Sequence, residues 1–320
     1  MISIELAVDR FLEHKRALGR KYDSEERELR LLVRFAAEHD VGALEELAPA
    51  LLDDFLAARP RSRSRSFNHL LGVVRCLFDW AVRYELLDAS PLQARRRRET
   101  ATRIPFIFDS AQARRLLDAA GALPDNSWVR GRGSTYRTIF ALCYALGLRA
   151  GEACGLRVGN VDCSRALLVV EGGKFGKSRL VPHGPRIGEL VYQQLERRGR
   201  EERLDDDAPL FTFKGQRSVH PCSASQMFHK LVLDLGFTAP AGVSPPTLHC
   251  LRHSFAIGCL LRWYQQGLDP AVRLHQLATF MGHVDLVSTA VYLRITMALL
   301  QEANRRFEAF AEPVWAEMAR

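Results

Sequence analysis

The sequence lacks a long uninterrupted apolar stretch, and none of its cysteines are spaced as C-x-x-C. Its apolar runs fall short of the roughly 20 residues that a membrane-spanning helix needs. The first residues show no basic-then-apolar leader. The seven cysteines are scattered, several of them within apolar helical patterns, which is typical of small buried side chains. We therefore expect a soluble cytoplasmic protein with free thiols, no structural zinc and no membrane partner.

Basic residues outnumber acidic ones. The chain has 45 Lys and Arg against 37 Asp and Glu, a net charge of +8, which favours a polyanionic partner. A single run of charge is as often a solvated surface as a binding site. The candidates for contacts with nucleic acid form three groups: Arg61, Arg63 and Arg65; Arg95, Arg96, Arg97 and Arg98; and Lys174, Lys177 and Arg179.

The first part of the chain reads as a helical bundle. Apolar residues recur at helical spacing, for example at Leu70, Val74 and Leu77. Pro91 disfavours helix in the residue before it and so ends the last of these helices. The pattern predicts a helical domain over residues 1–92 and a polar, basic linker over residues 93–105.

The remaining residues, 106–320, predict a second domain that is mainly helical. Gly147 is placed to end its second helix. Two short runs rich in β-forming residues, 166–171 and 178–182, flank a glycine-containing turn. Helical spacing then continues to about residue 311. The predicted fold is therefore mainly α, with one small antiparallel sheet in the second domain.

Four short motifs in this domain contain residue types that act on phosphate esters. They are Gly147-Leu148-Arg149-Ala150-Gly151-Glu152, Lys174 in the hairpin, His249-Cys250-Leu251-Arg252-His253, and Gly282-His283 followed nine residues later by Tyr292. Each alone has an ordinary structural explanation, because a helical His or Tyr usually packs and an Arg after a helix usually lies on the surface. Together they supply what phosphodiester exchange needs: a nucleophile, cations, an acid and a base.

The spacing of these residues suits one shared phosphate. Tyr292 offers a phenol that becomes nucleophilic when its proton is removed, and the planar guanidinium groups of Arg149 and Arg252 suit phosphate oxygens. His249 lies three positions before Arg252, on the same face of a helix. For His253 we expect a structural role. Glu152 either orients Arg149 or complements a helix dipole.

The order of these motifs resembles that of the tyrosine recombinases, the family of phage integrases and Xer-type resolvases. The resemblance covers most of the chain, since the helical N-terminal part is similar to the core-binding domain of that family. It implies a 3′-phosphotyrosyl intermediate with no metal or nucleotide cofactor. It also implies a role for each residue: Tyr292 as nucleophile, Arg149 and Arg252 as phosphate clamp, Lys174 as general acid, His249 as proton-transfer partner, and His283 as hydrogen-bond donor to the transition state.

The same resemblance implies a partner and an assembly. We expect double-stranded DNA with inverted-repeat core sites, bound by a tetramer of the protein. Lys177 shares the hairpin with Lys174, so one residue of slippage in the turn would exchange their roles. The tail from Phe310 is expected to dock either on a neighbouring subunit or on its own domain.

Two other interpretations remain open. A type IB topoisomerase would use the same tyrosine chemistry as a monomer, without exchanging partner strands. A non-cleaving accessory protein would keep the fold and the DNA binding alone. The residues present at all six catalytic positions argue against the accessory protein, and the recombinase-like N-terminal bundle argues against the topoisomerase.

Overall fold

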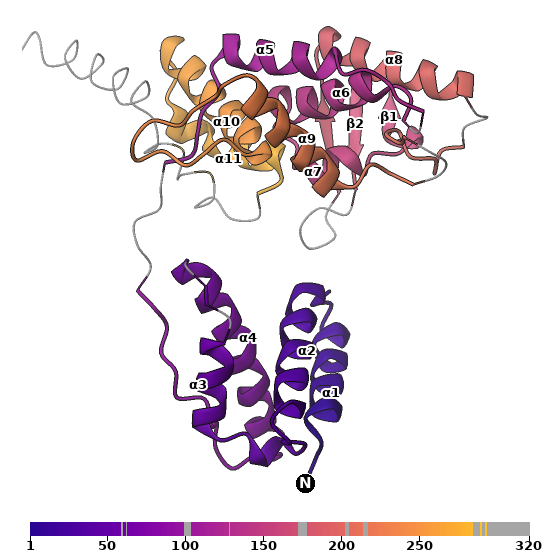
Figure 1. The fold of residues 1–320 in the computed structure, drawn as a ribbon. Helices are drawn as coiled ribbons and strands as arrows, with labels where there is room; N and C mark the ends of the chain where they lie inside the picture. The colour runs from indigo at the N-terminus through magenta and orange to yellow at the C-terminus, as the bar shows by residue number, and fades with distance from the viewer. Residues whose placement is uncertain are drawn as a thin grey trace, which may run out of the picture. The chain divides into compact units, whose positions relative to one another are not determined.

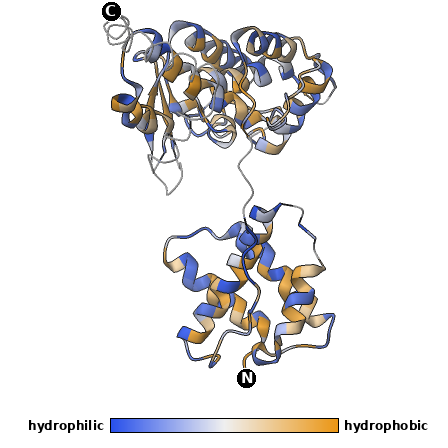
Figure 2. Ribbon diagram, turned by 90° about the vertical axis from the view of Figure 1, so that its left-hand side faces the viewer, coloured by the Kyte–Doolittle hydropathy of each residue, from blue (hydrophilic) through white to orange (hydrophobic). Residues whose placement is uncertain are grey.

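The chain forms two compact units, Met1–Thr102 and Arg103–Arg320. This computed structural model describes residues 1–58, 60–61, 63–98, 104–127, 129–171, 178–201, 205–213, 217–283, 289 and 292. Figure 1 labels the α-helices and strands β1 and β2. Each unit has a hydrophobic core of its own, and its helices turn their apolar residues inward (Figure 2).

The regular elements among the described residues of the first unit are all helices. Its elements are α1 (Ile4–Ala17), α2 (Asp23–Ala37), the 3-10 helix η1 (Leu44–Glu46), α3 (Pro49–Ala57) and α4 (Ser64–Arg83). Apolar residues one helical turn apart, such as Leu70, Val74 and Leu77, are fully buried on α4 because they form a single stripe along that helix. The bundle predicted from the first 90 residues is confirmed.

The segment after α4 is attached to the first unit. The Asn68 side chain, buried on α4, accepts from the backbone N–H of Arg97 and donates to its carbonyl, each over 2.8 Å. Arg75 donates to the carbonyl of Ala94 over 2.8 Å, and Leu92 belongs to the core. Residues 93–98 of the expected 93–105 linker are therefore bound to α4.

The second unit combines helices with one sheet. Its helices are α5 (Ser110–Gly121), α6 (Arg132–Ala145), α7 (Ala150–Cys154), the 3-10 helix η2 (Val158–Asn160), α8 (Pro185–Glu201), α9 (Pro221–Asp234), α10 (Leu248–Gln265) and α11 (Pro270–Met281). Asp109 caps α5 by accepting from the Gln112 N–H over 2.8 Å, as an aspartate before the first turn of a helix commonly does. Helix α6 packs against both α5 and α10 and so lies at the centre of this unit's core.

The described strands form a three-stranded antiparallel sheet in the order β1-β2-β3. They are β1 (Val161–Asp162), β2 (Leu167–Val170) and β3 (Arg179–Pro182). Strands β2 and β3 pair with Val170 opposite Arg179. Leu168, Val170 and Val181 face the core, because alternate residues of a strand share a face. The mainly α fold with a small antiparallel sheet is confirmed.

None of the helices in the described ranges is long and apolar enough to cross a membrane. All seven cysteines lie in those ranges and are free thiols. Cys143, Cys154 and Cys250 are buried, and burial raises the pKa of the Cys154 thiol to about 12.

Candidate active site

Arg149 is held in place by the turn between α6 and α7. Gly147 adopts a left-handed conformation, with φ +61°, and a Cβ there would come within 2.4 Å of the Phe255 ring. Only glycine meets both conditions without strain. Leu148 is fully buried and anchors the turn. Arg149 follows directly at the start of α7, where its backbone N–H donates to Glu152 Oε2 over 2.9 Å.

Arg252 lies on α10 with its side chain only 2% exposed. Its guanidinium donates to the carbonyl of Gly147 and, over 2.8 Å, to that of Met281. Burial, together with the charge of nearby Arg149, lowers the pKa of Arg252 to about 10. The group therefore stays charged at neutral pH and connects three separate parts of the second unit.

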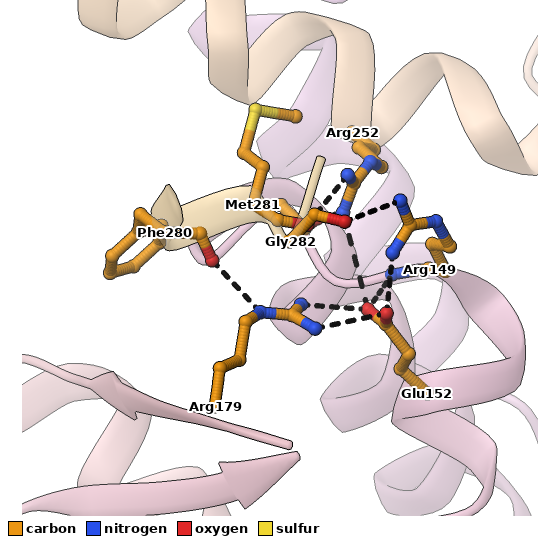
Figure 3. A network of polar contacts seen from close by, with 8 residues as sticks. Arg149, Glu152, Arg179, Arg252, Phe280, Met281 and Gly282 are labelled. Carbon is orange, nitrogen blue, oxygen red and sulfur yellow. Dashed lines mark hydrogen bonds and ion pairs between the residues drawn. The ribbon is translucent and has the colours of Figure 1, made fainter. Parts of the chain in front are cut away.

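Glu152 joins the arginines into one network, which Figure 3 shows. Its side chain is 7% exposed and accepts from Arg149 Nη1 over 2.6 Å. Arg179 binds both carboxylate oxygens, over 3.0 and 2.8 Å. Burial alone would raise the pKa of Glu152, but hydrogen bonds from Arg179 and from the Arg149 backbone lower it to about 2. Of the two roles considered for Glu152, the contacts show that it orients Arg149.

Tyr292 is buried, with 3% of its surface exposed. Its hydroxyl lies 2.9 Å from His253 Nδ1, and its ring stacks with His283 at a centroid distance of 6.4 Å. Burial raises the pKa of Tyr292, while the positive charges of Arg252 and Arg149 act in the opposite direction. The phenol is therefore neutral at physiological pH and needs a proton acceptor to become a nucleophile.

Three histidines gather near this tyrosine: His253 contacts its hydroxyl, His283 its ring, and His249 contacts His253. The rings of His249 and His253, one turn apart on α10, meet edge to face at 4.6 Å. Burial first, and then neighbouring positive charge, lowers the pKa of both His253 and His283 to about 4. Partial desolvation and the charges of Arg252 and Arg149 also lower the pKa of His249. Neutral imidazoles can accept a proton, and this arrangement places one against the tyrosine.

Two residues of the site differ from their sequence-based interpretation. His253, expected to be structural, contacts the Tyr292 hydroxyl. Arg179, expected to contact DNA, is 12% exposed and paired with Glu152, because it points from β3 into the network. The signal for His253 was its position one turn after His249. No local signal distinguishes Arg179 from its basic neighbours.

The structure brings five of the six predicted catalytic residues together: Arg149, His249, Arg252, His283 and Tyr292. Lys174 and Lys177 lie outside the described residues, as does the tail from Phe310. The hairpin strands that flank the two lysines are formed as expected.

The other predicted DNA-contacting residues belong to the first unit. Arg63, Arg65 and the run Arg95–Arg98 are exposed. Arg61 differs, since it pairs with Glu28 over 2.7 Å and its side chain is 22% exposed. The Arg97 guanidinium lies 3.8 Å from the centroid of the Phe67 ring and donates to the Arg61 carbonyl. Arg61 and Arg97 thus have structural contacts within this unit.

Comparisons with known proteins agree with this site. Residues 107–298 match the model of the phage integrase family. The chain is 32% identical to a Sinorhizobium fredii protein named as an integrase/recombinase (y4rB), over 96% of this chain and 98% of that one. It is 29% identical to the tyrosine recombinase XerD of Ralstonia nicotianae, over 87% and 85% of the two chains.

The fold is also similar to that of a solved structure. A lambda integrase dimer bound to a COC′ core site superposes with a TM-score of 0.64 at 16% identity, covering 91% of this chain and 77% of that one. The family model covers the entire arginine, histidine and tyrosine cluster. The chain therefore belongs to the phage integrase family, the tyrosine recombinases.

Proposed function

We propose that this protein is a site-specific DNA recombinase that cleaves and rejoins strands through a 3′-phosphotyrosyl intermediate on Tyr292. The observation that carries the proposal is the contact of the Tyr292 hydroxyl with His253, at 2.9 Å, inside a cluster that also holds Arg252 and Arg149. A phenol, a neutral base and two guanidinium groups around one point are suited to attack on a phosphodiester.

These groups can supply the bond changes and proton transfers of strand cleavage. The Tyr292 oxygen forms a bond to phosphorus while the bond from phosphorus to the 5′ oxygen breaks, and the phenolic proton passes to His253, with His249 beside it. The leaving 5′ oxygen takes up a proton. The family resemblance implies that Lys174 donates it as the general acid. The 5′ hydroxyl then gives up its proton and attacks the equivalent phosphotyrosyl bond of a partner strand, and Tyr292 of the protomer on that strand leaves and regains its phenolic proton.

The two clamp arginines have different exposures. Arg149 is 30% exposed and is the guanidinium that a phosphate reaches first. Arg252 is almost fully buried and keeps its charge. In this proposal it therefore stabilises the negative charge of the phosphate from the interior side of the site. His283 lies against the Tyr292 ring, and this position supports the role that the family resemblance implies for it, a hydrogen-bond donor to the transition state.

We assign double-stranded DNA with inverted-repeat core sites as the substrate, held by a tetramer of this chain in the cytoplasm. The similar lambda integrase structure is a dimer on a core site, which supports a DNA partner and a multimer. In this proposal residues 1–92 form the core-binding domain and residues 106–320 the catalytic domain. The exposed arginines Arg63, Arg65, Arg95, Arg96 and Arg98 then contact the DNA backbone.

The decisive experiment removes the tyrosine oxygen. On a nicked substrate whose short 5′-hydroxyl fragment diffuses away, the native protein is expected to accumulate as a covalent adduct that peptide mapping places on Tyr292. Tyr292→Phe keeps the ring and should bind the site without forming any adduct. Tyr192→Phe, at an exposed position on α8, serves as the matched control. An adduct on another tyrosine, or cleavage by Tyr292→Phe, would overturn the proposal.

A topoisomerase of type IB is the second candidate. The relatives matched over nearly the whole chain are named as recombinases, which favours strand exchange. A synapsis assay separates the two, since a recombinase holds two sites together before exchange. Relaxation of supercoils by a monomer, without synapsis, would favour the topoisomerase. A protein that binds the site but forms no adduct would be the accessory protein.

A further inference from the structure

The guanidinium of Arg179, the first residue of β3, is fully engaged inside the second unit. Its Nη1 and Nη2 donate to the two oxygens of Glu152, over 3.0 and 2.8 Å, and its Nε donates to the Phe280 carbonyl over 2.9 Å. The side chain is 12% exposed. Unlike Arg252, whose Nη atoms donate to neutral carbonyls, Arg179 has both Nη atoms on one carboxylate, and it would have to break that buried ion pair to turn its fork towards a DNA phosphate.

Three successive carbonyls at the end of α11 are each bound by a different arginine. The pairs are Arg179 with Phe280, Arg252 with Met281 at 2.8 Å, and Arg149 with Gly282 at 3.0 Å (Figure 3). The last carbonyls of a helix have no partner within it and carry its negative dipole end, so cations bind there favourably. We call this arrangement the arginine-capped end of α11. His283 follows it directly.

Glu152 is bound from two sides. The Arg179 guanidinium donates to both carboxylate oxygens, and Arg149 donates to Oε2 through its backbone N–H and to Oε1 through its side chain, over 2.9 and 2.6 Å. A two-point pairing with a guanidinium fixes the plane of a carboxylate. The orientation of Glu152, and through it the position of the Arg149 guanidinium, is therefore set jointly by Arg179 on β3 and by the start of α7.

The chain turn before His283 is also shaped around Arg179. Gly282 is left-handed, with φ +66°, and a Cβ at this position would lie 2.8 Å from Arg179 Nη1. The backbone N–H of His283 then donates to the Ala278 carbonyl over 2.8 Å. Arg179 thus packs against the residue at which the chain leaves α11 towards His283.

We propose that Arg179 is a positioning residue, which fixes Arg149 through Glu152 and His283 through the arginine-capped end of α11 in the arrangement that receives the scissile phosphate. The inference rests on the proposed recombinase function. It assigns Arg179 to the cleavage step and removes it from the DNA-contacting surface.

The test compares Arg179→Gln and Arg179→Lys with the native protein. Three quantities are measured: the single-turnover rate of adduct formation on the nicked substrate, the dissociation constant for the site, and the melting temperature. We expect adduct formation to slow by about 10-fold to 100-fold in both variants, while the dissociation constant changes by less than about threefold, as expected for a group that contacts no phosphate.

Lysine should not rescue the rate, because one ammonium cannot reproduce the two-point contact of the guanidinium with Glu152. Arg165→Lys, an exposed arginine in the turn between β1 and β2, is the control and should match the native protein.

Coupling to Glu152 distinguishes positioning from general support of the fold. Arg179→Gln combined with Glu152→Gln should slow adduct formation no more than the slower of the two single variants, because both act through one contact. Independent multiplication of the two effects would overturn the inference. So would a rate equal to that of the native protein, full rescue by lysine, a weakened dissociation constant with an unchanged rate, or a parallel loss of binding, melting temperature and rate. Absence of an adduct from the native protein would instead refute the proposed function.

Discussion

Replacing Arg149 and replacing Arg252, the two arginines of the phosphate clamp, should have different effects on the stability of the fold. Arg252→Ala would strip the buried carbonyls of Gly147 and Met281 of their donor. Unpaired buried polar groups are costly, so we expect unfolding free energy to fall by about 2 to 4 kcal/mol. Arg149→Ala, at a more exposed position, should lower it by about 1 kcal/mol or less. Adduct formation should be lost in both.

Urea unfolding, followed by the nicked-substrate assay, measures both quantities. Equal stability of the two variants would contradict the central position given to Arg252. Near-native cleavage by either one would contradict the clamp itself.

Protonation of the buried histidines predicts how stability depends on pH. The pKa of His253, like that of His283, is lowered from an ordinary 6.5 to about 4. Between these values the unfolded chain binds more protons than the folded one, so stability is fully present above pH 6.5 and is lost as the pH falls towards 4. The groups that face His253 are His249, Arg252, His283 and Tyr292.

Unfolding midpoints in urea between pH 7.5 and pH 4.5 test this dependence. His253→Asn should show a shallower decline than the native protein, because one of the two titrating imidazoles is gone. A native midpoint that stays constant from pH 7 to pH 5 would refute the lowered pKa values.

For individual residues, the sequence predicted which side chains form the site better than it predicted which of them contact one another. Arg149, His249, Arg252, His283 and Tyr292 were identified by residue type and order, since phosphate chemistry restricts the groups that can serve. Which histidine contacts the tyrosine depends on a contact between residues 39 positions apart, His253 and Tyr292, and local sequence does not encode such a contact.

Among the elements, the contact between α4 and residues 93–98 leads to a direct test. Asn68→Ala removes both hydrogen bonds to the Arg97 backbone, so the segment should detach more often and become a better protease substrate. Trypsin cleaves after arginine, and the exposed run Arg95–Arg98 offers its sites. We expect tryptic cutting there to speed up by about fivefold or more, as for the loss of roughly 1 kcal/mol of local stability. His69→Ala, at the neighbouring exposed position, should leave the cutting rate unchanged.

The same contact explains why the sequence could not define the linker. Residues 93–98 are basic and lack periodicity, so they read as unstructured. Their attachment depends on the side chains of Asn68 and Arg75, which lie 29 and 19 positions away from the backbone groups that they bind. Helices, by contrast, were recognisable because apolar residues repeat along them within a few positions, and Gly147 marked the end of one of them.

For the whole molecule, the net charge of +8 predicts DNA binding that weakens steeply with salt, because bound lysines and arginines release counterions. Replacing Arg95, Arg96 and Arg98 with Ala should weaken binding to site and non-site DNA alike. It should also reduce the slope of log affinity against log salt by up to about 2.7, the value for three lost phosphate contacts. Arg97 is kept because its guanidinium packs on the Phe67 ring and donates to the Arg61 carbonyl. Unchanged affinity would assign the run to solvent.

The arginine-capped end of α11 determines which kinds of mutation in that helix the protein tolerates. Its partners are main-chain carbonyls, which no point mutation removes, so the side chains at Phe280 and Met281 can vary without detaching the three arginines. An inserted or deleted residue within α11 is different. Each residue turns a helix by about 100°, which would carry all three carbonyls away from their arginines at once. We therefore expect sequence changes in α11 to be substitutions, and insertions or deletions within the helix to be damaging.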